Sequence, residues 1–221
     1  QFHLNGYVYV YYAVKGENRN RVSRFSSSGD RADEDSELVL VDLDVISATI
    51  HNGGALFFKG GKLFIGTGDG GTSGRAQSSS SLMGKILRIN TDGSIPEDNP
   101  FYTSLTGNFR LIYATGLRNP FTAAVQPGTE RVFINDVGKS KWEEVNELVA
   151  GKNYGWPLIE GPRTTEPLPE NYQDPVYAYP HTEGCSIVGA AYYNPQNPSF
   201  PSKYLGKYFF GDYCKGYIKV L

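Results

Sequence analysis

The chain has 221 residues, a formal net charge of −2 and a sequence pI near 6.0. This balanced charge gives no reason to expect nucleic-acid binding, and no apolar stretch approaches the roughly 18 residues needed to span a bilayer. The 26 Gly, 13 Pro, 16 Tyr and 12 Phe, with a single Met, argue against a helical bundle. They favour short strands joined by tight turns.

Short apolar runs bounded by turn residues predict strands along the whole chain. The clearest hairpin joins 55–58 to 63–66 through the turn Lys59–Lys62. The other predicted strands are 7–14, 21–25, 85–89, 110–114, 123–125, 131–134, 187–193, 208–210 and 217–220. Helical turns are expected only at 78–83 and 142–148. The sequence therefore predicts an all-β fold.

A loose repeat narrows the choice among all-β folds. Short strands with turn signals every eight to twelve residues are typical of a sandwich, a barrel or a propeller. A turn, a basic residue and three apolar residues recur at 61–66, 129–134 and 206–211, which favours a propeller. The Pro-rich segments 93–107 and 161–179 are expected to be surface loops.

Both ends of the sequence look cut within a fold. The chain begins at Gln1 rather than Met, and strand-like sequence starts at once and runs to Leu221. Residues 1–221 are thus predicted to form a single, incomplete propeller domain. Blades need roughly 40–50 residues each, so the chain holds about four. Because only a closed ring removes sheet edges, we expect another segment or another chain to complete or cap it.

His51 and Asp69 are the first candidates for chemistry. His51 precedes two glycines, and Asp69 ends the hairpin that follows it. That hairpin is expected to return the carboxylate to the imidazole, where it would fix the tautomer that a general base needs. The alternative is a structural histidine and an Asx turn at Asp69. The surrounding glycines are no dinucleotide fingerprint, because no helix follows them.

Two further groups offer ligand chemistry. Arg118 and Asn119 stand together just before a predicted strand, and a planar guanidinium suits carboxylates. Asp136 and the carbonyls around Gly138 supply oxygen atoms of the kind that calcium accepts. From the residues alone a turn with a surface arginine is the favoured interpretation of the first group, and Asp136 also fits a simple turn.

Ordered motifs across the chain resemble the glucose/sorbosone dehydrogenase family, which includes enzymes that use pyrroloquinoline quinone (PQQ). The matching stretches are 51–56, 67–71, 83–101, 116–120, 144–146 and 151–157. The resemblance implies a six-bladed β-propeller of the quinoprotein glucose dehydrogenase type, with about four blades in this chain. It also implies oxidation of the anomeric hydroxyl of an aldose sugar to the lactone, with hydride passing to PQQ and then electrons to an acceptor.

The resemblance assigns roles to the candidates. It implies that His51 is the general base and that Asp69 orients it. It places Arg118 and Asn119 on the quinone. It places a calcium ion (Ca2+) at the turn that contains Gly138.

Asp136 lies close to that turn in the sequence, and we include it in the expected metal site. The turn reads Val137-Gly138-Lys139 here, where quinone-binding members have Gln-Gly-Pro. This departure keeps an alternative open: a non-catalytic extracellular propeller of the same family that binds proteins or serves in assembly.

Cys185 and Cys214 are the two cysteines of the chain. The residues alone leave a disulfide and two buried thiols open. Segments 184–189 and 211–214 resemble the cysteine-bearing members of the family, in which a Cys pair links neighbouring strands. That resemblance implies a disulfide here and, with it, an extracellular or periplasmic location.

Overall fold

The structure is a computed structural model that describes residues 5–163 and 166–221. Four antiparallel sheets make up the described part. The first contains β1 (Tyr7–Ala13), β2 (Asn20–Ser28), β3 (Arg31–Ala32) and β4 (Leu38–Asp42), with the 3-10 helix η1 (Glu34–Ser36). The second contains β5 (Gly53–Lys59), β6 (Lys62–Thr67), β7 (Lys85–Ile89) and β8 (Ile112–Ala114), with η2 (Ser73–Gln77) and η3 (Gly107–Leu111).

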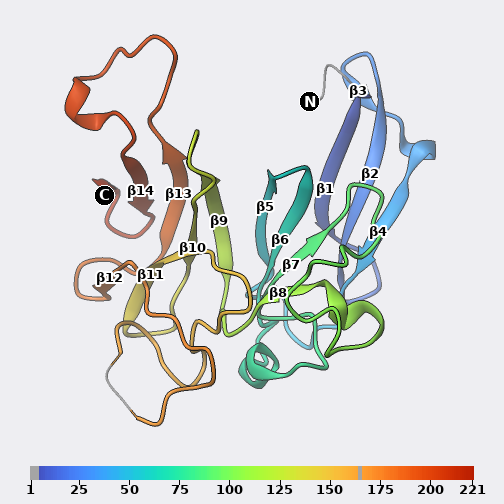
Figure 1. Cartoon of the computed structure of the whole chain (residues 1–221), viewed down its shortest axis with the longest axis horizontal. Coiled ribbons are helices and arrows are strands. Elements are labelled where there is room, and N and C mark those ends of the chain that lie inside the picture. Colours follow the sequence, from blue (N-terminus) through green and yellow to red (C-terminus); the bar gives the residue numbers. More distant parts are fainter. Residues whose placement is uncertain (1–4, 164–165) are drawn as a thin grey trace.

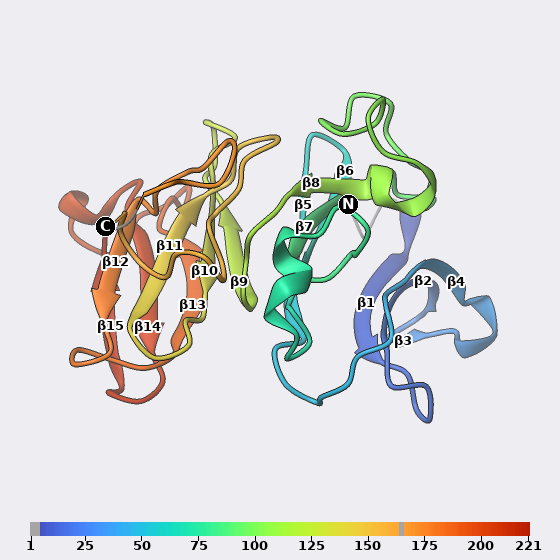
Figure 2. The same ribbon diagram turned by 90° about the horizontal axis from the view of Figure 1, so that it is seen from below.

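The other two sheets follow in chain order. The third contains β9 (Pro120–Val125), β10 (Val132–Asp136), β11 (Trp142–Glu147) and β12 (Tyr177–Pro180). The fourth contains β13 (Ile187–Tyr192), β14 (Tyr208–Asp212) and β15 (Tyr217–Val220), with η4 (Ser202–Tyr204). Figure 1 shows the sheets side by side as successive blades, and Figure 2 shows the same order from below. The all-β prediction with about four blades is confirmed.

Apolar side chains fill each joint between neighbouring blades. The first joint sets Val22 and Val41 against Leu63 and Ile65, all at most 3% exposed. The other joints follow the same plan: Phe64 and Ile86 against Val132 and Ile134, then Phe133 and Val145 against Ile187 and Phe210. Each such side chain contributes about 1.5–3 kcal/mol when buried. This packing places the first strands β5, β9 and β13 next to one another.

Three predictions of local structure are wrong. Residues 142–147 form strand β11 rather than a helical turn, and the turn expected at 78–83 occurs earlier, at Ser73–Gln77. The expected loop 161–179 contains the start of β12. The polar sequence of β11 hides its strand character, because Glu143 and Glu144 are both buried between blades. No helix in the described ranges is long and apolar enough to cross a membrane.

Candidate functional site

The candidate site residues gather at one end of three neighbouring blades. In each of these blades the start of the first strand pairs with the end of the second. The pairs are Gly53 with Thr67, Pro120 with Asp136, and Ile187 with Asp212. The loops that precede β5, β9 and β13 therefore meet the loops that follow β6, β10 and β14.

An aspartate stands at this end in each of the three blades, as Asp69, Asp136 and Asp212. Each carboxylate accepts hydrogen bonds from the loop that precedes the first strand of its own blade. The N–H groups of Arg118 and Asn119, for example, donate to Asp136 at 2.9 and 2.6 Å. Our sequence analysis missed this pattern, although each Asp closely follows the apolar run of the repeat.

The structure brings His51 and Asp69 together. His51 Nδ1 lies 2.7 Å from Asp69 Oδ1, and the carboxylate is only 1% exposed. The Gly71 N–H and Trp156 Nε1–H also donate to this carboxylate, at 2.8 and 2.9 Å. Burial alone raises the pKa of Asp69, but these donors outweigh it and hold the pKa below its usual value. Asp69 is thus an ionised acceptor that keeps the proton on Nδ1 of His51.

The backbone around His51 depends on a glycine. His51 has φ +53°, in the left-handed region that few non-glycine residues adopt. Its carbonyl oxygen lies so close to Gly68 that a Cβ there would be 1.9 Å away. The glycine in Gly68-Asp69 therefore allows the close approach that carries Asp69 to the imidazole.

Arg118 connects the imidazole to the next turn. Its Nη2 lies 2.7 Å from His51 Nε2, and because Nδ1–H donates to Asp69, Nε2 is the unprotonated nitrogen that accepts from Arg118. Its Nη1 donates to the carbonyl oxygens of Val137, at 2.8 Å, and Gly138. The guanidinium also lies 5.5 Å from the ring centre of Trp156. Arg118 Nε is buried without a partner among the described residues.

The residues fit an anionic quinone and a cation in different ways. Asn119 uses its Oδ1 to accept the Gly53 N–H at 2.9 Å. Its amide and the guanidinium of Arg118 are donors of the type that quinone and carboxylate oxygens require. The carbonyls of Val137 and Gly138 converge on one positive nitrogen, so a cation suits that point. This donor set is compatible with PQQ and with oxygen-ligated Ca2+.

Asp136 accepts hydrogen bonds from the backbone that carries Arg118 and Asn119. Its two carboxylate oxygens accept backbone N–H groups from Arg118 and Asn119. Burial raises the pKa of Asp136 to about 7, although these two donors lower it. In the described ranges no group of three or more His, Cys, Asp or Glu side chains gathers into a metal site. Asp136 positions the Arg118–Asn119 backbone, and Gly138 retains a carbonyl suited to a cation.

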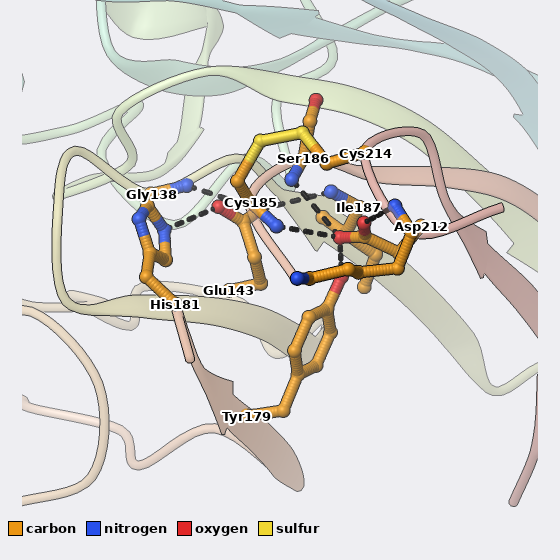
Figure 3. Close-up of a disulfide and its surroundings, with 10 residues drawn as sticks. Gly138, Glu143, Tyr179, His181, Cys185, Ser186, Ile187, Asp212 and Cys214 are labelled. Carbon is orange, nitrogen blue, oxygen red and sulfur yellow. Dashed lines mark hydrogen bonds and ion pairs between the residues drawn. A yellow bond between two sulfur atoms is a disulfide. The ribbon is translucent and has the colours of Figure 1, made fainter. Parts of the chain in front are cut away.

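A second His–carboxylate pair lies on the other side of the Gly138 turn (Figure 3). His181 Nε2 is 2.7 Å from Glu143 Oε1, and the Glu143 side chain is fully buried. The other oxygen, Oε2, accepts the N–H groups of Ile187 at 3.0 Å and Gly138 at 3.3 Å. Burial raises the pKa of Glu143 despite these donors. Our sequence analysis missed this pair because its members are 38 residues apart.

The predicted disulfide is confirmed. Cys185 and Cys214 are joined, with their Cα atoms 5.7 Å apart (Figure 3). Asp212 binds the same two loops: it accepts the N–H groups of Cys185, Ser186 and Lys215 at 2.9 to 3.0 Å, and the Tyr179 hydroxyl at 2.9 Å. A covalent link and a buried carboxylate therefore fix the loop that runs into β13.

A buried lysine fixes a loop that is hydrogen-bonded to Trp156, one of the donors to Asp69. Lys85 Nζ donates to the carbonyls of Arg75, Ala76 and Met83 at 2.6 to 2.9 Å, which fixes the loop around η2. Gln77 on this loop donates to the Trp156 carbonyl at 2.7 Å. Burial lowers the pKa of Lys85 to about 7. No local sequence signal marks this role, since Lys85 stands in an ordinary predicted strand.

Comparisons with known proteins find similar sequences. The Glucose / Sorbosone dehydrogenase family model matches residues 1–218. The aldose sugar dehydrogenase YliI of Escherichia coli (strain K12) is 32% identical over 170 residues, which covers 72% of this chain and 45% of that protein.

Solved structures of sugar dehydrogenases have a similar fold. The soluble aldose sugar dehydrogenase (Asd) from Escherichia coli, in the apo-form, has a TM-score of 0.85 and 27% identity, covering 99% of this chain and 65% of that one. The PQQ-bound aldose sugar dehydrogenase (Adh) from Streptomyces coelicolor has a TM-score of 0.74 at 24% identity, covering 100% and 64%, and shows the fold alone. The prediction of a quinoprotein glucose dehydrogenase-type six-bladed propeller is confirmed. This chain spans about two thirds of such structures and under half of the curated relative.

Proposed function

This chain belongs to the glucose/sorbosone dehydrogenase family, and we propose that it carries the catalytic base of a PQQ-dependent aldose dehydrogenase. The proposed reaction oxidises the anomeric hydroxyl of an aldose to the lactone. The observation that carries the proposal is the His51–Asp69 pair, in which a buried carboxylate leaves Nε2 of the imidazole as an acceptor. A separate electron acceptor would complete each turnover.

His51 performs the proton transfer in this proposal. The hydroxyl proton at the anomeric carbon passes to Nε2, while hydride leaves the same carbon. Asp69 holds the ring in the required tautomer and stabilises the positive charge that forms on it. In this structure Nη2 of Arg118 lies 2.7 Å from Nε2 of His51. The sugar hydroxyl therefore replaces the guanidinium at Nε2 when it binds.

The quinone is held by the residues around Arg118. When bound, PQQ supplies the hydride acceptor for the reaction. Arg118 and Asn119 would hold PQQ as hydrogen-bond donors, and the Gly138 carbonyl would contribute to a Ca2+ site. The buried Nε of Arg118, which lacks a partner among the described residues, supports a ligand of this kind. Asp136 keeps both residues in place through their backbone N–H groups.

The disulfide supports a proposal about location. A disulfide persists in an oxidising compartment, so we place the protein outside the cell or in the periplasm. The remaining blades, from the same protein or from another chain, would close the ring.

Reconstitution of the full-length protein tests the function. We expect PQQ to bind in a calorimetric titration with Ca2+ present, and a panel of aldoses to drive reduction of an artificial electron acceptor. A chelator should weaken PQQ binding if the Gly138 carbonyl helps to hold a Ca2+ ion that the quinone needs. If the folded protein binds no PQQ, the dehydrogenase proposal is wrong, and a non-catalytic extracellular propeller with a protein-binding or assembly role becomes the better explanation.

A further inference from the structure

The proposed chemistry uses one His–carboxylate pair, and the His181–Glu143 pair has no assigned role. Its imidazole is partly exposed, at 21%, while its carboxylate is fully buried. Nε2 of His181 is hydrogen-bonded to Glu143. The other ring nitrogen, Nδ1, makes no hydrogen bond to any residue in the described ranges. The pair therefore leaves one ring nitrogen of a partly exposed imidazole without a hydrogen-bond partner among the described residues.

The imidazole is held in place by its backbone and its side chain. The His181 N–H donates to the Lys141 carbonyl at 2.9 Å. The turn that contains Lys141 is itself fixed, because Glu160 Oε1 accepts the N–H groups of residues 139, 140 and 141 at 2.8 to 2.9 Å. A ring held this firmly loses little conformational entropy when it binds a ligand.

Neutralising the charge of the buried Glu143 carboxylate does not fully explain why His181 is there. Glu143 Oε2 already accepts two backbone N–H groups, so the carboxylate has donors of its own. All three partners of Glu143 are N–H donors when His181 carries its proton on Nε2, which matches an ionised carboxylate. Nδ1 of the neutral ring is then a lone-pair acceptor.

The position of His181 connects it to the first pair. The Gly138 N–H donates to Glu143, and the Gly138 carbonyl accepts from Arg118. Arg118 in turn contacts His51 Nε2. The two imidazoles thus flank the Arg118–Gly138 unit, one at each end of a continuous hydrogen-bonded chain.

We propose that His181 is a sugar-binding residue, whose Nδ1 accepts a hydrogen bond from a hydroxyl of the aldose other than the anomeric one. This inference rests on the proposed function, which makes an aldose the substrate. The chemistry favours a polyhydroxylated ligand, because an uncharged acceptor recognises an O–H donor. No bond forms or breaks at His181, so its contribution is to binding.

Steady-state kinetics of His181→Ala test the inference. A neutral hydrogen bond contributes about 0.5–1.5 kcal/mol, so KM for D-glucose should rise roughly 2- to 13-fold with kcat nearly unchanged. Thr182→Ala, at an exposed neighbour on the same loop, is the matched control and should behave as wild type. Among mono-deoxy glucoses, the one lacking the bound hydroxyl should show the same KM in wild type and His181→Ala.

Two outcomes overturn the inference in these assays. One is an unchanged KM in His181→Ala for every sugar. The other is a fall in kcat that accompanies a lower melting temperature, with no deoxy sugar that abolishes the difference in KM, because that pattern belongs to a purely structural role for His181.

Histidine ring NMR supplies a readout that does not need turnover. The His181 signal is the ring signal that is present in wild type and absent from His181→Gln. We expect D-glucose to shift this signal. A shift without PQQ-dependent turnover in wild type would reject the proposed function and keep the binding role. Turnover with no shift would reject the binding role and keep the function.

Discussion

The His51–Asp69 and His181–Glu143 pairs have nearly the same geometry but different surroundings. Both have a nitrogen–oxygen distance of 2.7 Å, a buried carboxylate and an imidazole that is about one fifth exposed. The remaining nitrogen of His51 faces Arg118, whereas that of His181 has no partner in the described part of the chain. A carboxylate therefore sets the tautomer in both pairs, and the neighbours decide what the free nitrogen does.

The two carboxylates also differ in charge preference. The pKa of Asp69 is held low by donors from His51, Gly71 and Trp156, despite burial. Burial dominates at Glu143 and raises its pKa. Two more acids with raised pKa values lie nearby: Glu144 follows Glu143 on β11, and Asp136 lies on the paired strand β10. Donors therefore outweigh burial at Asp69, whereas at Glu143 burial raises the pKa although all three partners are N–H groups, and Glu143 belongs to an acidic cluster.

Asp69→Asn should produce the largest effect, because it removes the group that fixes the His51 tautomer. An amide can donate to Nδ1 and so leave the proton on Nε2, which would disable the base. We expect kcat for aldose oxidation to fall roughly 10²- to 10⁴-fold, the usual size of general-base catalysis. Asp30→Asn, at an exposed turn, is the control. Wild-type kcat in Asp69→Asn would show that the tautomer is irrelevant.

Replacing both Cys185 and Cys214 by serine should lower stability and loosen the region around the His181–Glu143 pair. The disulfide closes a sequence separation of 29 residues, for which the chain-entropy account gives about 3–4 kcal/mol. We expect urea unfolding to show a loss of this order. Hydrogen exchange should increase around residues 181–187 and stay unchanged at 51–53. Equal changes in both regions would mean that the blades do not separate the two pairs.

Trp156→Phe should weaken the first pair while leaving an aromatic ring under Arg118. It removes the Nε1–H donor that lies 2.9 Å from Asp69 Oδ2. A hydrogen bond to a charged group contributes about 1.5–3 kcal/mol, and two other donors remain on Asp69. We expect a decrease in kcat of about tenfold and an unchanged KM. A raised KM with unchanged kcat would assign Trp156 to sugar binding instead.

Glu144→Gln should alter the pH dependence of stability. Burial and the charge of Asp136 raise the pKa of Glu144 from 4.5 to about 8. Between these values the unfolded chain has released the proton that the folded chain retains, so stability falls as pH rises. Wild-type melting temperature should decline by several degrees from pH 5 to pH 8, and the variant should show a flatter curve. If the melting temperature falls equally with pH in wild type and in Glu144→Gln, Glu144 does not cause the pH dependence of stability.

Sequence reasoning reached the first pair and missed the second for a physical reason. His51 and Asp69 flank one hairpin, so local turn signals bring them together, and the family motifs supply Arg118 and Asn119. His181 and Glu143 meet only because β11 and β12 pair within one blade and the next blade packs against them. Strand β11 itself was mistaken for a helical turn, since buried glutamates resemble a polar surface.

The most direct test of the account is rapid mixing of the PQQ-loaded protein with aldose, because it separates proton transfer by His51 from sugar binding by His181. The absorbance of the quinone would be followed in wild type, His51→Ala and His181→Ala over a range of sugar concentrations. We predict that His51→Ala binds PQQ normally but loses at least 10²-fold in limiting rate, while His181→Ala keeps the limiting rate and needs more sugar to reach it. A wild-type limiting rate in His51→Ala would contradict the account.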